Sequence, residues 1–171
     1  MADTLAALAP IATARLRLSP LSGNDAPAVR DVTDHPEITR RIDFLASPFT
    51  LRDAEALVAR NAGASERMLG IRRGEDDALI GVIGAHLHGE HEIEVGYWLG
   101  RDCHGRGYAT EALCGLVDAL RRCLPERRIV AECDPQNLAS WRVLAKAGFQ
   151  TTGQAGARPG RRLLALSGPP G

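Results

Sequence analysis

The 171-residue chain lacks several features that would assign it to a broad class at once. Its 21 basic side chains are matched by 21 acidic ones, whereas a general nucleic-acid-binding domain is usually basic. We therefore expect no nucleic-acid partner. No apolar run approaches the roughly 20 residues of a membrane-spanning helix, so we expect no membrane partner either. Residues 1–12 have no basic stretch ahead of their apolar ones and do not resemble a secretory signal.

The four cysteines contain no closely spaced pair of the kind that binds a metal. We expect them to be reduced thiols in a cytoplasmic protein, mostly as small core residues. Cys103 precedes a glycine-rich loop, where it is either a more reactive thiol or an ordinary loop residue. His86 and His88 share one face of a strand, but no third ligand accompanies them. We therefore expect no metal site, and we interpret both histidines as surface or substrate-cleft residues.

Turn signals and apolar periodicity predict a single domain over residues 13–166, with a tail at each end, 1–12 and 167–171. Short alternating or apolar runs predict strands at 13–18, 67–72, 79–87, 92–99, 129–133, 149–152 and 161–166. Apolar residues that recur at helical spacing behind a capping residue predict helices at 26–32, 36–42, 51–62, 109–122 and 138–147. This order predicts an α+β fold on a mixed sheet.

The most informative stretch is residues 103–111, which read Cys-His-Gly-Arg-Gly-Tyr-Ala-Thr-Glu between a predicted strand and a predicted helix. A tight glycine loop at a helix N-terminus leaves main-chain N–H groups without internal partners, and the helix dipole adds positive charge. Such a loop is an anion site, most often for phosphate. No Lys-Ser or Lys-Thr follows it, and its glycines do not complete a dinucleotide fingerprint. From these residues alone, the loop is either a phosphate cradle or a plain turn.

Together with its flanking elements, this loop resembles a known family. Residues 94–100 and 104–112 are similar to the acetyl-CoA motif of the GNAT acetyltransferases, in their RimJ/RimL-like branch. Residues 13–18, 48–55 and 137–149 resemble that branch's opening strand, second helix and closing helix, in family order. The resemblance implies the GNAT acyl-CoA N-acyltransferase fold, which is α+β with a central mixed, mostly antiparallel sheet flanked by helices.

The resemblance implies acetyl-CoA as the cofactor, released as CoA. Amides of the loop would hold its diphosphate, namely those of His104, Gly105, Arg106, Gly107, Tyr108, Ala109 and Thr110. Main-chain groups of Trp98, Leu99 and Gly100 would pair with the pantetheine arm, and one N–H there would polarise the thioester carbonyl. Asn137 would cap its helix, bond to pantetheine, or do both. His104 replaces the usual Gln or Arg, which we do not interpret as loss of function.

Acetylation of an amine needs a proton acceptor for the amine and a donor for the leaving thiolate. Glu94 occupies the branch's acidic position and is the first candidate base. Glu92, on the same strand face, is the second, and either could instead be a solvated carboxylate. Many members of the family use a Tyr of the last helix as the acid, but Leu144 stands there. The branch has a Ser at the position of Ser140, which is the candidate acid, with a backbone bond at the helix start as the alternative.

The resemblance implies an N-acetyltransferase that passes the acetyl group of acetyl-CoA directly to a primary amine in a ternary complex. The acceptor would be a protein N-terminus or a small amine, bound between residues 26–61 and the loop 158–161. The alternative is a non-catalytic acyl-CoA-binding or interaction module on the same fold, which the missing Tyr leaves open and against which Glu94 and Ser140 count. Related folds often pair, so the resemblance also implies a homodimer.

Overall fold

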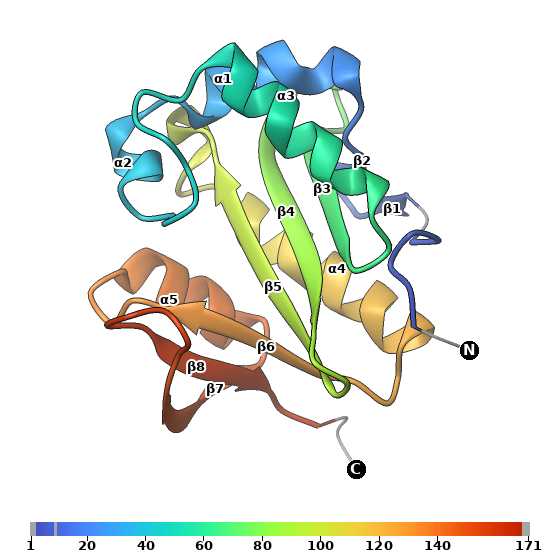
Figure 1. The fold of residues 1–171 in the computed structure, drawn as a ribbon, viewed down its shortest axis with the longest axis vertical. Coiled ribbons are helices and arrows are strands. Elements are labelled where there is room, and N and C mark those ends of the chain that lie inside the picture. Colours follow the sequence, from blue (N-terminus) through green and yellow to red (C-terminus); the bar gives the residue numbers. More distant parts are fainter. Residues whose placement is uncertain (1–2, 9, 169–171) are drawn as a thin grey trace.

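The computed structural model describes residues 3–8 and 10–168, which form an eight-stranded sheet with helices on both faces (Figure 1). The strands are β1 (Ile11–Ala12), β2 (Leu16–Pro20), β3 (Glu66–Arg73), β4 (Leu79–His88), β5 (Glu92–Leu99), β6 (Arg128–Cys133), β7 (Phe149–Ala155) and β8 (Arg162–Leu166). Their order across the sheet is β1-β2-β3-β4-β5-β6-β8-β7. Only β5 and β6 pair in parallel among these neighbours of the described chain, which confirms the predicted mixed, mostly antiparallel α+β fold.

The helices divide the core into two clusters, one on each face of the sheet. They are α1 (Ala26–Thr33), α2 (Pro36–Thr39), α3 (Leu51–Ala59), α4 (Tyr108–Cys123) and α5 (Leu138–Lys146). Helices α4 and α5 bury their apolar sides on one face, where Leu116 and Leu144 are almost completely enclosed. Helices α1, α2 and α3 cover the other face, with Val29 and Leu57 in its core. No helix in the described part of the chain has the length and apolar character needed to cross a bilayer.

Local sequence signals fixed the helix starts well. Thr50 and Asp53 form the reciprocal capping box that opens α3: the Asp53 N–H donates to Thr50 Oγ1, and the Thr50 N–H donates to Asp53 Oδ2. Asn137 caps α5 by accepting the N–H of Ser140 on its Oδ1 atom at 3.3 Å. The Asn137 cap confirms the prediction made for that residue. Both caps link residues only three positions apart in the chain, so they are readable from local sequence.

The described part of the N-terminal segment packs against the domain, where the sequence predicts a tail. Leu5 and Leu8 are buried in the core cluster under α4, and Ile11–Ala12 forms β1 beside β2. The first predicted strand correspondingly begins at Leu16 and not at residue 13, because Thr13 turns the chain: its N–H donates to the carbonyl of Leu16 at 2.9 Å. The apolar residues of this segment therefore complete the core. Residues 1–2, 9 and 169–171 of the two predicted tails lie outside the described residues.

Strands β5 and β6 pair over a short stretch only. Residues Glu92 to Glu94 lie beside Arg128 to Val130, and within the described chain no strand pairs with the rest of β5 on that side. Beyond this stretch β6 continues with β8 as its neighbour. Strands β5 and β6 diverge from each other there (Figure 1). The divergence leaves one edge of residues 95–99 open in the middle of the sheet.

Candidate active site

The glycine loop after β5 presents an uninterrupted row of free amides. The main-chain N–H groups from Gly105 to Thr110 make no hydrogen bond within the described residues, and the N–H of Glu111 is the first to be satisfied inside α4. Gly105 and Gly107 have φ angles of 75° and 79°, a left-handed conformation that favours glycine. Because these amides lie at the positive, N-terminal end of the 16-residue helix α4, the loop fits a diphosphate.

Arg15 braces this loop, a role that the sequence analysis missed. Its Nη1 atom donates to the carbonyl oxygen of Arg106 at 3.0 Å, and its Nε atom donates to Glu111 Oε2 at 2.7 Å. Its guanidinium carbon lies 4.6 Å from the centre of the Tyr108 ring. Burial acts to raise the pKa of Glu111, but the bonds from Thr13 and Arg15 outweigh it and hold that pKa below its usual value. The turn between β1 and β2, residues 13–15, therefore fixes the start of α4.

The open edge of β5 is formed by alternate residues. The Gly100 N–H donates to the Ile80 carbonyl of β4 at 2.8 Å, and the Gly100 carbonyl accepts from Cys103. Alternation in an antiparallel ladder then directs the main chain of Trp98 toward β4 and that of Tyr97 and Leu99 toward the open side. Of the three residues predicted to pair with pantetheine, Leu99 thus has the suitable orientation, and Tyr97 joins it. Gly100 already has both main-chain groups bonded inside the fold.

His104 holds the loop to this edge. Its Nε2 atom donates to the Leu99 carbonyl at 2.9 Å, so the Leu99 N–H is the group that remains directed at the opening. Cys103, just before it, is half-buried against the core, which suits an ordinary loop residue.

A pair of hydroxyl groups lies on the α5 side of the opening. Tyr97 Oη is 2.8 Å from Ser140 Oγ and 3.3 Å from the Ser140 carbonyl oxygen. The Ser140 hydroxyl is thus bonded to a tyrosine and not to the backbone at the helix start. Leu144, which replaces the family's usual Tyr, is 1% exposed in the core. Asn137 caps α5 through its side-chain carbonyl oxygen, so its amide NH₂ group is the part that can reach a ligand.

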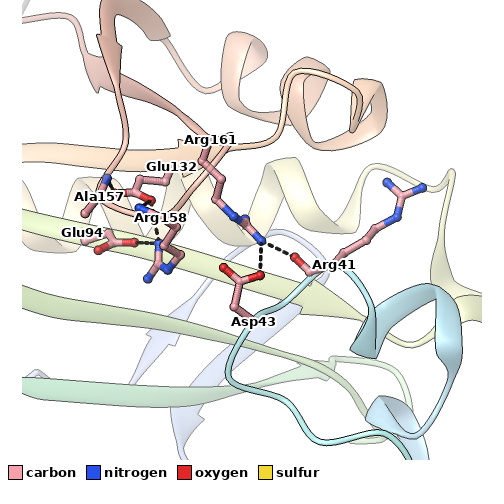
Figure 2. A network of polar contacts seen from close by, with 7 residues as sticks. All are labelled: Arg41, Asp43, Glu94, Glu132, Ala157, Arg158 and Arg161. Atoms are coloured by element: carbon pink, nitrogen blue, oxygen red, sulfur yellow. Dashed lines mark hydrogen bonds and ion pairs between the residues drawn. The ribbon is translucent and has the colours of Figure 1, made fainter.

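A network of ion pairs lies on the face of β5 that carries Glu94, opposite to the face that carries Tyr97 (Figure 2). Arg158, in the β7–β8 loop, donates through Nη1 to Glu94 Oε1 at 2.6 Å and to Glu132 Oε2 at 3.1 Å. Glu132 also accepts the N–H groups of Ala157 and Arg158, at 2.6 and 3.2 Å. Glu132 is therefore the anchor of this loop, a role that the sequence did not reveal. Glu94 keeps its second oxygen, Oε2, outside these bonds.

The two segments predicted to enclose an acceptor contact each other beside this network. Arg161 Nη2 donates to the carbonyl oxygen of Arg41 at 2.6 Å and to Asp43 Oδ1 at 3.3 Å (Figure 2). The exposed His86 lies directly opposite Glu94 on β4, so it belongs to the same face. Glu92, the second candidate base, lies farther from the glycine loop and pairs with Arg128.

Comparisons with known proteins agree with this geometry. The model of a family described as "Acetyltransferase (GNAT) domain" matches residues 15–150. A curated relative, the uncharacterized N-acetyltransferase YnaD of Bacillus subtilis (strain 168), is 31% identical over 144 residues, which are 84% of each chain. The chain belongs to the GNAT acetyltransferase family. It is an enzyme of that family, and its cofactor is acetyl-CoA.

Solved structures show the same fold. The acetyltransferase (GNAT family) from Bacillus anthracis superposes with a TM-score of 0.82 at 26% identity, over 92% of this chain and 97% of that one. Mycobacterium smegmatis RimJ in complex with CoA-disulfide superposes with a TM-score of 0.81 at 20% identity, over 96% and 90% of the two chains.

Proposed function

We propose that this acetyltransferase passes the acetyl group directly to a primary amine while both substrates are bound. The observation that carries the proposal is the arrangement around the open edge of β5. The free amides of the glycine loop lie at one end of this edge, the Ser140 hydroxyl flanks it on the α5 side, and Glu94 lies on the opposite face. A donor for the leaving group and an acceptor for the amine proton thus flank the same opening, as direct transfer requires.

Bound acetyl-CoA supplies an activated acetyl thioester. The free amides of residues 105–110 bind its diphosphate, whereas the His104 N–H already donates to the Arg101 carbonyl at 3.3 Å. Gly105 and Gly107 keep side chains out of that contact. The main chain of Tyr97 and Leu99 holds the pantetheine arm, where an N–H polarises the thioester carbonyl. Asn137, at the start of α5, donates from its amide NH₂ group to the pantetheine arm across the opening from β5.

Glu94 accepts the proton of the attacking amine, through its free Oε2 atom or through a water molecule. Ser140 donates a hydrogen bond to the sulfur as negative charge develops there. The exposed His86 beside Glu94 is a second acceptor on the same face. We therefore assign Glu94 as the base and Ser140 as the hydrogen-bond donor.

The acceptor binds between the 40–45 segment and the β7–β8 loop, where Asp43, Arg41, Arg158 and Arg161 offer both signs of charge. This lining supports a polar amine, either a protein N-terminus or a small molecule. The absence of a Tyr at residue 144 leaves non-catalytic CoA binding as the alternative. The hydroxyl pair of Tyr97 and Ser140 supplies a replacement, which favours catalysis. A cytoplasmic homodimer stays a prediction, for which light scattering of the purified chain measures the assembly.

The test is release of the CoA thiol from acetyl-CoA, measured against a panel of small amines and N-terminal peptides. We expect thiol release to depend on an amine. Glu94→Gln should lower kcat at least about 10²-fold, and Ser140→Ala should lower it less, while CoA binding measured by calorimetry is retained. Glu90→Gln, in the exposed β4–β5 turn, is the matched control and should behave as the wild type. Full turnover by both site variants would refute the assigned roles.

A further inference from the structure

Tyr97 is the one side chain of β5 that reaches across the opening to α5 through a polar contact in the described residues. Its hydroxyl lies 2.8 Å from Ser140 Oγ, and a second contact of 3.3 Å reaches the carbonyl oxygen of the same serine. The rest of the Tyr97 side chain packs against the core below α4 and α5. The aromatic ring is thus held in place, and its hydroxyl group is directed at Ser140.

Hydrogen counting shows why this contact matters. A serine hydroxyl has a single proton, which it gives either to Tyr97 or to a ligand. The Tyr97 hydroxyl also has a single proton, and of its two possible acceptors Ser140 Oγ, at 2.8 Å, is nearer than the Ser140 carbonyl oxygen, at 3.3 Å. When the tyrosine donates to Ser140 Oγ, the serine proton is free to point into the opening. A donor that itself accepts a hydrogen bond is also polarised and donates more strongly.

Tyr97 keeps its proton throughout the neutral range. Burial raises the pKa of the Tyr97 hydroxyl to about 12, against the opposing effect of its bond with Ser140. The Cys133 thiol, at the end of β6, is a titratable neighbour of the pair. Burial raises the pKa of this thiol as well, above the opposing effects of Ser140 and of the Arg161 and Arg41 charges, whereas the Asp134 charge adds to the increase. Near neutral pH both groups are therefore uncharged.

We propose that Tyr97 is a positioning residue for acetyl transfer: it donates a hydrogen bond to Ser140 Oγ and thereby directs the serine proton at the CoA sulfur. The inference rests on the proposed function, because it assigns the Ser140 hydroxyl to the leaving group. No O–H bond breaks at either residue. The electron pair of the C–S bond stays on sulfur, the two hydroxyl groups stabilise that charge, and the released thiolate takes its proton from water.

A purely structural role would give different results. If Tyr97 only tethered α5 to β5 through the Ser140 carbonyl, Tyr97→Phe would loosen α5 and lower the thermal midpoint. It would not alter the ionisation of bound CoA. If the Tyr97 hydroxyl acts through its hydrogen bond to Ser140, Tyr97→Phe should instead alter the ionisation of bound CoA. That effect should disappear when the Ser140 hydroxyl is absent.

The first experiment measures the ionisation of the bound thiol and needs no acceptor. The ultraviolet absorbance of the thiolate is followed against pH for the CoA complex, with the desulfo-CoA complex subtracted to cancel protein tyrosines and Cys133. We expect the bound CoA thiol of the wild type to titrate below free CoA. Tyr97→Phe should raise its pKa by about one unit, the effect of one charge-assisted hydrogen bond. Ser140→Ala should raise it at least as much, and the double variant no more than Ser140→Ala.

The second experiment is steady-state kinetics. Tyr97→Phe should lower kcat about tenfold with an unchanged KM for acetyl-CoA, and it should add nothing in the Ser140→Ala background. Thr152→Val is the matched control, because it also removes a hydroxyl-to-carbonyl bond, the one to Leu163 at 2.9 Å in the β7–β8 hairpin. It should change neither kcat nor the thiol titration.

Several outcomes would overturn the inference. A wild-type complex in which bound CoA titrates like free CoA, or a Tyr97→Phe effect of equal size with and without Ser140, would each do so. Failure of the proposed function looks different: CoA binds and its thiol titrates as expected, but no amine triggers thiol release. If the purified chain does not bind CoA, both proposals are wrong.

Discussion

Gly81 of β4 sets the position of the strand that we assign to acetyl-CoA binding. It lies opposite Leu99 of β5 in the sheet. A Cβ atom added at Gly81 would overlap the carbonyl oxygen of Trp98 and would lie 2.7 Å from Leu99 Cδ2 and 3.0 Å from Leu99 Cα. Main-chain atoms dominate these contacts, so no rotation of a side chain relieves them. Gly81→Ala should therefore push the end of β5 away from β4.

The size of the effect follows from the distances. Ordinary contacts of a Cβ atom lie at 3.4 to 4 Å, so β5 must move by roughly 1 Å. Overpacking of this kind costs about 1–3 kcal/mol of the free energy of unfolding, which exceeds the gain of about 0.5–1 kcal/mol from removing a strand glycine. The same shift displaces the Leu99 N–H, and a misplacement of about 1 Å should lower kcat/KM by about 10²-fold.

Urea unfolding measures the first quantity, and thiol-release kinetics with CoA calorimetry measures the second. Gly96→Ala is the matched control, because Gly96 lies on β5 itself and an added Cβ atom meets nothing within 4 Å. That variant should be as stable as the wild type or slightly more stable, and should bind CoA equally well. A Gly81→Ala protein with wild-type stability and CoA affinity would refute the reasoning.

Two further predictions concern ion pairs. Arg15→Met removes the bond to the Arg106 carbonyl and should weaken CoA binding several-fold by calorimetry. Arg17→Met, the control, loses only an exposed ion pair with Asp77 and should bind CoA like the wild type. Equal CoA affinities of the two variants would contradict the bracing role of Arg15. Asp25→Asn should cost about 1–3 kcal/mol in urea unfolding at pH 7, since Asp25 and Arg72 are paired and 12% and 16% exposed. Burial acts to raise the pKa of Asp25, but its hydrogen bonds outweigh burial and leave that pKa lowered. The stabilisation is thus present above about pH 4, the range of an unperturbed Asp, and is lost as the pH falls through the lowered pKa. The two proteins should therefore converge in acid below that lowered pKa, and a constant difference in the free energy of unfolding would contradict this.

Much of the site was accessible from the sequence because its signals are local. The glycine loop at 103–111, the capping residue Asn137 and the limits of β5 all depend on residues a few positions apart. Their conformations follow from backbone sterics and from unsatisfied N–H groups. The family resemblance added Glu94 and Ser140 as reactive candidates, although it could not show what each one contacts.

The partners of these residues were not accessible in the same way. Arg15 and Glu111 are 96 positions apart, Arg158 and Glu94 are 64 apart, and Tyr97 and Ser140 are 43 apart. Nothing in the local pattern of an arginine or a tyrosine tells which distant group it meets. The N-terminal segment was misjudged for the same reason, because Leu5 and Leu8 find their core only after α4 has packed on the sheet.

The sequence by itself determined the order of the elements and the anion-binding loop, since both arise from periodicity, caps and glycines within short stretches. Tertiary structure alone decided where β5 leaves β6, which of its main-chain groups face the opening, and which side chains brace the groups beside it. Those features depend on strand pairing and on contacts between distant segments, whose free energy is gained only when the whole sheet has formed.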